Sequence, residues 1–279
     1  MKTYLLPLLL LLCILSGCTG HSDQEADVKN QPVSIEMTTN YGIITLQLYN
    51  ETPLHRDNFM NLVQEGYYDS LQFHRVIEHF VIQGGDPDSK YASITDTIGF
   101  GGLPYTIPAE FHPELFHKRG AVGAARGDHP QRESGSTQFY IVQGQVVSDS
   151  MMTVAQSRIN NWLARHYAKN DPIYKSLQDS IQHYTETGNE TRLREMNARF
   201  QAIVDEYDQF ERYEIPAEHR KYYQTIGGIP HLDQNYTVFG EVIEGMNVVD
   251  SIATVNTNSM DRPVDEVRIL KMRVIENEN

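Results

Sequence analysis

Residues 73–86 read FHRVIEHFVIQGGD, an apolar run that ends at a Gly-Gly pair. Its aromatic and β-branched residues favour strands, and side chains alternate between the two faces of a strand. Arg75 and Gln83 are an even number of positions apart, so they share a face if the chain turns back between them. Phe80 has the other parity, so a bend near Glu78-His79 is needed to bring it beside them. The pattern predicts a buried hairpin that carries these three side chains together. An ordinary hairpin with a solvated arginine is the alternative that residue types leave open.

Two strands and a helix are expected before this hairpin. Apolar residues alternate with polar ones over residues 34–37 and 44–49, with Asn40-Tyr41-Gly42 as the turn. Thr52 and Pro53 then suit the N-cap and the first position of a helix. Further strands are expected at residues 73–76, 80–83, 121–124, 139–142, 237–244 and 267–275, and a second helix at 246–253. Short strands with two helices predict a closed, mainly antiparallel β structure.

Residues 150–222 differ from the rest because their apolar residues recur at helical spacing. The three stripes comprise Ile159, Trp162, Leu163 and His166; Ile173, Leu177, Ile181 and Tyr184; and Leu193, Met196, Phe200, Ile203, Val204 and Tyr207. Plain packing explains such stripes better than a cofactor site does. We therefore expect a three-helix insert at the surface, where client polypeptides or a protein partner could bind.

The N-terminus has the features of an export signal. A positive start at Lys2 and a short apolar run lead to Leu15-Ser16-Gly17-Cys18, which resembles a bacterial lipobox. Cleavage there would remove residues 1–17 and leave Cys18 as a lipid anchor, followed by an acidic tether over 18–32. We expect a protein anchored in the cell envelope, at the outer membrane facing the periplasm, with exposure at the cell surface left open. An ordinary signal peptide with a chance cysteine, or an uncleaved anchor, is the alternative.

Composition excludes several classes of partner. The 279 residues carry a net charge of −14, which argues against nucleic acid and against electrostatic adhesion to an anionic leaflet. The 2 cysteines both lie at or before Cys18, so the mature chain would hold no disulfide.

The 11 histidines include no pair with an acidic or cysteine companion at a convincing spacing, so we expect neither a metal nor a cofactor.

The hairpin sequence resembles the signature of the cyclophilin family of peptidyl-prolyl cis/trans isomerases. Two further blocks, Ser136–Ile141 and His231–Met246, resemble the family's second and third core blocks in the same order. The resemblance implies an eight-stranded antiparallel barrel, closed and capped by two helices, formed by residues 33–149 and 223–279. The helical insert over 150–222 lies outside the resemblance.

By this resemblance, the catalytic residues are Arg75, Phe80 and Gln83. The residues that would contact the substrate are Val81, Ala124, Ala125, Gln138, Tyr140, His231, Leu232 and Tyr236. For the apolar members of this set, core packing is the competing interpretation. The sequence also departs from the family, which commonly has Trp at the position of His231 and His at that of Tyr236. These departures put tight cyclosporin binding in doubt.

The implied reaction needs no bond to break. Rotation about an X–Pro bond crosses a barrier of about 18–20 kcal/mol, which arises from amide resonance. A fixed cation aimed at the prolyl nitrogen would favour the resonance-broken transition state, and arginine suits that role because it is always charged. We expect an isomerase that acts on X–Pro bonds of exported, proline-containing polypeptides. A peptide-binding chaperone or assembly scaffold with little isomerase activity is the alternative.

Overall fold

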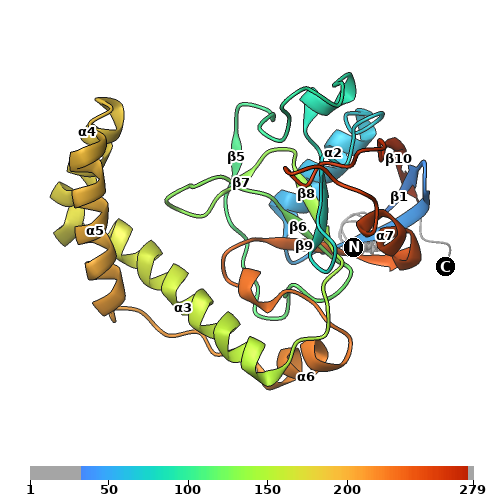
Figure 1. Cartoon of the computed structure of the whole chain (residues 1–279). Helices are drawn as coiled ribbons and strands as arrows, with labels where there is room; N and C mark the ends of the chain where they lie inside the picture. Colours follow the sequence, from blue (N-terminus) through green and yellow to red (C-terminus); the bar gives the residue numbers. More distant parts are fainter. Residues whose placement is uncertain (1–32, 276–279) are drawn as a thin grey trace, which may run out of the picture. The chain divides into compact units, whose positions relative to one another are not determined.

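The computed structural model describes residues 33–275, and its centre is an eight-stranded antiparallel sheet that curls around one core (Figure 1). The strands lie in the order β10-β1-β2-β9-β6-β8-β4-β3. Their bounds are β1 (Val33–Thr39), β2 (Gly42–Leu48), β3 (Arg75–Val76), β4 (Val81–Gly84), β6 (Ala121–Ala124), β8 (Phe139–Val142), β9 (Val238–Glu244) and β10 (Ile269–Ile275). Two short strands, β5 (Thr106–Ile107) and β7 (Ser134–Gly135), pair separately. The eight predicted strand regions are all confirmed.

The prediction of a closed barrel is not supported. Within residues 33–275, the edge strands β3 and β10 do not form a ladder with each other. β3 is only 2 residues long, and the chain before it meets the start of β10 only through the isolated bridge between Gln72 and Arg268 and a few backbone hydrogen bonds. The sheet is therefore curled and open, because its last strand is too short to pair across the gap.

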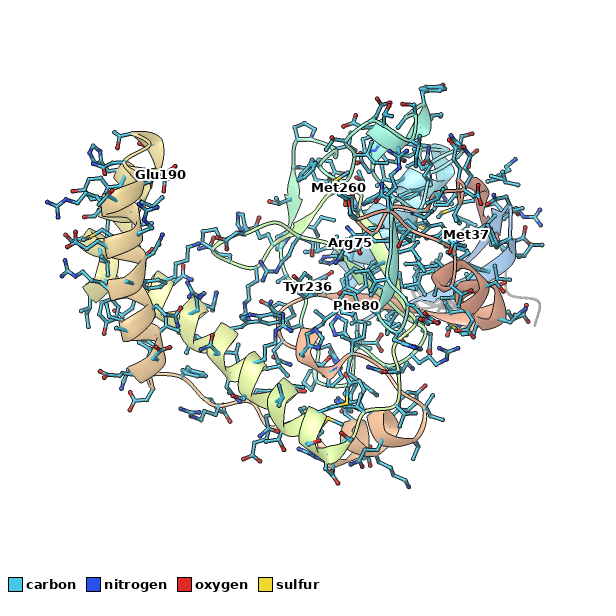
Figure 2. The ribbon with its side chains drawn as sticks, viewed as in Figure 1. Met37, Arg75, Phe80, Glu190, Tyr236 and Met260 are labelled. Atoms are coloured by element: carbon cyan, nitrogen blue, oxygen red, sulfur yellow. The ribbon has the colours of Figure 1, made fainter. Side chains whose placement is uncertain are left out.

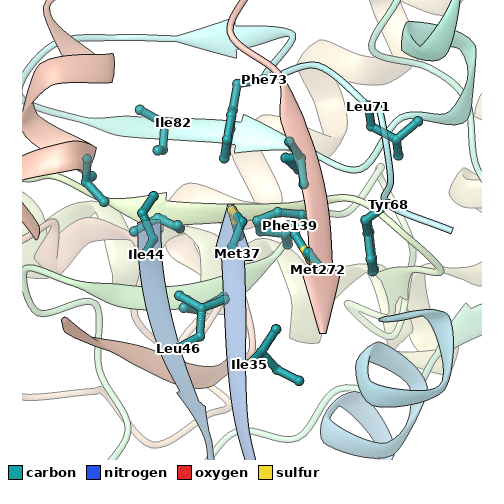
Figure 3. Close-up of a cluster of buried hydrophobic side chains, with 14 of the residues drawn as sticks. Ile35, Met37, Ile44, Leu46, Tyr68, Leu71, Phe73, Ile82, Phe139 and Met272 are labelled. Carbon is teal, nitrogen blue, oxygen red and sulfur yellow. The ribbon is translucent and has the colours of Figure 1, made fainter. Parts of the chain in front are cut away.

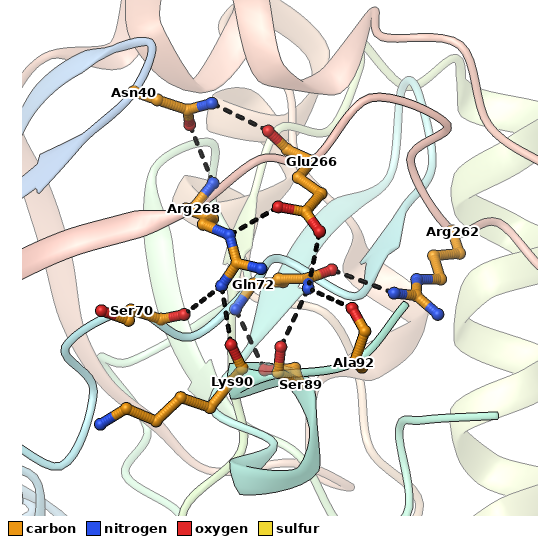
Figure 4. A network of polar contacts seen from close by, with 9 residues as sticks. All are labelled: Asn40, Ser70, Gln72, Ser89, Lys90, Ala92, Arg262, Glu266 and Arg268. Carbon is orange, nitrogen blue, oxygen red and sulfur yellow. Dashed lines mark hydrogen bonds and ion pairs between the residues drawn. The ribbon is translucent and has the colours of Figure 1, made fainter. Parts of the chain in front are cut away.

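Side chains hold the two edges together across that gap (Figure 4). The guanidinium of Arg268 donates to the carbonyls of Ser70 at 2.6 Å and Lys90 at 3.0 Å. Gln72 donates to the carbonyl of Ser89 at 2.9 Å and accepts from Arg262 at 3.2 Å. These bonds fix the loops that flank the hairpin and so fix the place where Arg75 begins β3.

The core lies between the sheet and the helices α2 (Pro53–Gln64) and α7 (Met246–Ala253). The alternating residues Ile35, Met37, Ile44 and Leu46 are completely buried, as their pattern predicts. Figure 3 shows them gathered with side chains from the hairpin and β8, among them Phe139. Each such side chain contributes about 1.5–3 kcal/mol by leaving water, so this core rigidly supports the strands that carry the candidate site.

The start of α2 differs in detail from the prediction. Thr52 occupies the N-cap position, but its hydroxyl is buried and has no hydrogen-bond partner among the described residues. Instead, the carboxylate of Glu110 accepts from the backbone N–H groups of Leu54 and His55, each at 3.0 Å. A carboxylate at this end also complements the helix dipole. The helix is thus capped from a distant loop rather than by its own first residue.

The segment after β8 is helical, as predicted. It contains α3 (Asp149–Asn170), α4 (Lys175–Glu186) and α5 (Glu190–Glu206), followed by α6 (Ala217–Thr225), which the sequence pattern did not reveal. The first and third apolar stripes are mainly packing surfaces: one cluster joins α3 to α6 and another joins α3 to α5. The second stripe is less buried, since no residue of α4 is buried and Ile173 just before it is exposed. No helix within residues 33–275 is long and apolar enough to cross a membrane. The predicted lipobox and Cys18 lie outside the described residues.

Candidate active site

The hairpin places Arg75 and Gln83 directly opposite each other on β3 and β4. Nη1 of Arg75 lies 3.5 Å from Oε1 of Gln83. The predicted bend is present, since His79 adopts a left-handed φ of 63°. It brings the ring of Phe80 to 5.8 Å from the guanidinium carbon of Arg75, and these side chains lie close together in Figure 2. The three proposed catalytic side chains therefore form one group.

A chain of carboxamides fixes the orientation of this group. Nε2 of Gln83 donates to Oε1 of Gln138 at 3.0 Å. Gln138 donates in turn to the carbonyls of Gly99 at 3.0 Å and Gly101 at 2.9 Å. Since each amide nitrogen is used as a donor, the oxygen of Gln83 is left to face Arg75. The arginine side chain remains 40% exposed, so the cation is positioned but still accessible to a ligand.

Three of the predicted substrate contacts form a packed floor. Val81, Tyr140 and Leu232 are 2%, 4% and 7% exposed and belong to one apolar cluster. The core-packing interpretation therefore holds for them in this structure, and a proline ring could meet only their outer edges. Phe80 and Tyr236 are partly buried against the same cluster, which makes them the accessible part of the apolar surface.

A buried chain of hydrogen bonds fixes Tyr140 of this floor, and the sequence analysis did not predict it. The hydroxyl of Tyr140 donates to Nε2 of His117 at 2.8 Å, and Nδ1 of His117 donates to Asp233 at 2.8 Å. The other carboxylate oxygen of Asp233 accepts from Tyr223 of α6 at 2.7 Å. Burial, followed by the nearby Tyr236 and Asp233, raises the pKa of Tyr140, which keeps the phenol protonated as a donor. No local pattern links these residues, because His117 and Asp233 are 116 positions apart.

The insert contributes to the aromatic surface beside Phe80. His231 stacks on Phe80 with ring centroids 5.9 Å apart and planes within 3°. Trp162 of α3 lies 6.4 Å from His231 and 6.5 Å from Tyr236, ring to ring. Burial, and then the charge of Arg158, lowers the pKa of His231 to about 4, so this ring is neutral at neutral pH. The indole of Trp162 thus reaches this surface from the insert, beside His231, the position at which the family commonly has Trp.

The backbone groups of Ala124 and Ala125, two of the predicted substrate contacts, already make hydrogen bonds within the protein. The N–H of Ala125 donates to the carbonyl of Gln138 at 2.9 Å, and its carbonyl accepts from Gly135 at 2.8 Å. Ala124 is buried and donates to the carbonyl of Thr237 at 3.0 Å. A carbonyl has a second lone pair, so a peptide would share these groups, and the role of both alanines stays a prediction. Among residues 33–275, no group of 3 or more metal-ligating side chains occurs.

Comparison with known proteins points to one family. The sequence model of the family "Cyclophilin type peptidyl-prolyl cis-trans isomerase/CLD" matches residues 34–168 and 210–274. A Staphylococcus haemolyticus protein named "Putative peptidyl-prolyl cis-trans isomerase" is 28% identical over 255 residues, which cover 90% of this chain and 96% of that protein. A Streptococcus pyogenes protein named "Putative bifunctional phosphatase/peptidyl-prolyl cis-trans isomerase" is 29% identical and aligns with 87% of this chain, but with only 38% of its own length.

Solved structures agree on the fold. A crystal structure of a Cryptosporidium parvum cyclophilin type peptidyl-prolyl cis-trans isomerase matches with a TM-score of 0.53 at 19% identity. It covers 89% of this chain and 100% of that chain. A second crystal structure of that protein, determined in the presence of the dipeptide Ala-Pro, matches with a TM-score of 0.50 at 18% identity and covers 88% of this chain and 99% of its own.

Proposed function

Because the chain belongs to the cyclophilin-type peptidyl-prolyl cis-trans isomerase family, we propose that its substrates are X–Pro bonds of exported polypeptides and that Arg75 is its catalytic cation. One observation carries the assignment of the site. Arg75 and Gln83 lie opposite each other on the two strands of the hairpin, Phe80 returns to Arg75 from the turn, and the amide of Gln83 is oriented by Gln138.

The proposed mechanism follows from this geometry. An X–Pro substrate would place its proline ring against Phe80, His231 and Tyr236, above the floor formed by Val81, Tyr140 and Leu232. The guanidinium of Arg75 would then donate to the prolyl nitrogen as amide resonance is lost. A donor that is already oriented stabilises the transition state without reorganising during the reaction. No covalent bond breaks and no proton is transferred, so no further catalytic group is required.

The cellular location of the protein is proposed from its N-terminal sequence. Leu15-Ser16-Gly17-Cys18 supports processing to a chain with lipid on Cys18, held at the outer membrane facing the periplasm. Labelling cells with a fatty acid carrying an alkyne tests this: wild type should acquire label and sediment with membranes, and Cys18→Ala should do neither. Label on the Cys18→Ala chain would contradict the anchor. Protease treatment of intact cells separates a periplasmic from a surface location.

Refolding of an exported protein with a native cis-proline tests the proposed function. Wild type should accelerate the slow, proline-limited phase, which takes tens to hundreds of seconds without a catalyst. Arg75→Ala should not accelerate it. Equal acceleration by the two chains would contradict the role of Arg75, and no acceleration by wild type would contradict the proposed substrates.

A chaperone or scaffold role is the second candidate, and the insert provides the observation that favours it. Several large apolar side chains of the insert are exposed, among them Val154 at 68% and Ile173 at 81%, and exposed apolar surface can bind unfolded clients. If this role dominates, Ile173→Asp should reduce the suppression of client aggregation while Arg75→Ala leaves it intact. Suppression that falls only with Arg75→Ala would contradict it.

A further inference from the structure

A cationic cavity lies between the insert and the loop that follows β6. Its volume is about 500 Å³. Arg165 and Lys169 of α3 line it together with Arg126 and Arg132 of the loop, and Asp128 is the one carboxylate among the described lining residues. This concentration of positive charge contrasts with the net charge of −14 for the whole chain. The charge of the cavity is therefore opposite in sign to the net charge of the chain.

Neutral groups, rather than carboxylates, hold the three arginines. Arg126 donates to the backbone and side-chain oxygens of Asn235 at 2.8 and 2.6 Å. Arg132 donates to the carbonyl of Gln234 at 2.6 Å, and Arg165 donates to the side chain of Gln201. These bonds fix the guanidinium groups in place, but no carboxylate within residues 33–275 forms an ion pair with them.

The fourth cation is only weakly neutralised. Lys169 lies 3.4 Å from Asp128, whose side chain is 91% exposed, and an ion pair so open to water contributes little. Two buried nitrogens on the cavity wall, Nε of Arg132 and Nε2 of Gln178, have no hydrogen-bond partner among the described residues. A buried donor without an acceptor is costly, so these two side chains add to the unfavourable polar environment around the cations.

The cations also act on one another. Burial, and then the charge of Arg126, lowers the pKa of Arg132. Burial, followed by Arg132, Arg126 and Lys169, lowers the pKa of His166 on α3. Mutual repulsion of this kind is relieved when an anion enters.

The cavity borders the proposed proline site, because both are lined by Tyr236. Tyr236 and Trp162 line the cavity, and Tyr236 packs against the floor residue Tyr140 with ring centroids 6.1 Å apart. Arg126 lines both this cavity and a second one of about 560 Å³ that contains Gln83 and Gln138. An extended chain advances about 3.3–3.6 Å per residue, so the residues next to a bound proline can reach the cationic walls.

We propose that this cavity binds aspartate or glutamate side chains that flank the proline of a client polypeptide, so that the insert gives the isomerase a preference for acidic sequences. The preference rests on the proposed function of the neighbouring site. A polypeptide is the occupant favoured by the wall that the cavity shares with the proline site, and carboxylates supply the negative charge that the arginines lack among the described residues.

A peptide series on the wild-type full chain tests the preference without any variant. Ala-Pro peptides flanked by Glu should show kcat/KM about five- to tenfold above otherwise identical peptides flanked by Gln, as a few partly screened ion pairs allow. The ratio should fall as salt is raised from low to physiological strength. Equal kcat/KM for both peptides would overturn the proposal, whereas failure to isomerise either peptide would overturn the proposed function instead.

Matched variants locate the effect. The double variant Arg165→Gln/Lys169→Gln should lose the Glu-over-Gln ratio. Arg192→Gln/Arg194→Gln removes the same charge from exposed positions of α5 outside the cavity and should keep the ratio. If both double variants change the ratio equally, general charge rather than this cavity is responsible, and the proposal fails.

Binding can also be read without isomerisation. Trp162 is the single tryptophan of the chain and lines the cavity, so its fluorescence reports occupancy. A hexapeptide of glutamate without proline should shift the emission in a saturable, salt-sensitive titration, and a glutamine hexapeptide should not. An emission that responds to neither peptide, or to both alike, would overturn the proposal.

Discussion

Gly123 of β6 lies against the ring of Tyr140, the floor of the proposed proline pocket. A Cβ added at Gly123 would lie 2.3 Å from Cζ and 2.4 Å from the hydroxyl oxygen of Tyr140. Carbon atoms in contact prefer about 3.5–4.0 Å. In Gly123→Ala the ring must therefore move by more than about 1 Å, and it can only move towards the pocket or out of register with His117.

The cost of this shift has two parts. Overpacking a core site costs about 1–3 kcal/mol. Breaking the 2.8 Å bond from Tyr140 leaves Nε2 of His117 buried without a partner, which costs about 1–3 kcal/mol. Together these parts should lower the free energy of unfolding of Gly123→Ala by about 2–6 kcal/mol. They should also lower kcat/KM, because the pocket floor is displaced.

Urea unfolding followed by circular dichroism measures the effect. Gly127→Ala is the control, because an added Cβ there meets nothing within 4 Å among the described residues, and we expect a change below about 0.5 kcal/mol. In a Tyr140→Ala background the clash is gone, so Gly123→Ala should cost less than about 1 kcal/mol. The same cost in both backgrounds, or a cost in wild type no larger than that of the control, would refute this reasoning.

Two further predictions concern stability. Glu110→Ala removes the acceptor for the N–H groups of Leu54 and His55 and should cost about 1–2 kcal/mol in urea unfolding; an unchanged midpoint would contradict the capping role. Burial lowers the pKa of His74 and of His231 from 6.5 to about 4. Between those values the unfolded chain binds protons that the folded chain does not, so stability should fall on acidification from pH 6.5 towards 4, by up to about 1.4 kcal/mol per pH unit for each histidine. Urea midpoints at several pH values test this, and a slope that is the same in His74→Leu as in wild type would contradict the assignment to His74.

The hairpin was predictable because its geometry is local. Even spacing put Arg75 and Gln83 on one face, and the parity of Phe80 demanded the bend that His79 provides. The same alternation predicted the buried residues of β1 and β2. Local rules of this kind were sufficient for the strands, the two covering helices and the grouping of Arg75, Phe80 and Gln83. The catalytic role of these residues came from the family resemblance.

What the sequence did not reveal depends on contacts between distant segments. Helical spacing marked Trp162 as a packing residue, but periodicity cannot say that its partners are His231 and Tyr236. The hydrogen bonds that link Tyr140, His117 and Asp233 depend on how several distant segments are placed relative to one another. The prediction of a closed barrel was wrong for a related reason. Residue types predicted a strand at residues 73–76, but they could not show that only Arg75 and Val76 pair, which leaves β3 too short to close the sheet.

The central claim is that the guanidinium of Arg75 lowers the barrier to rotation about an X–Pro bond. NMR exchange spectroscopy on an Ala-Pro peptide measures this directly, as the rate of cis–trans exchange with substoichiometric protein. Wild type should accelerate exchange. Arg75→Ala should lose about 100-fold or more in rate, which is typical for removal of a preorganised donor. Arg75→Lys should recover only part of it, because an ammonium lacks the planar fork. Arg75 is 40% exposed, so both variants should unfold at the wild-type urea midpoint. Equal acceleration by wild type and Arg75→Ala would contradict the account.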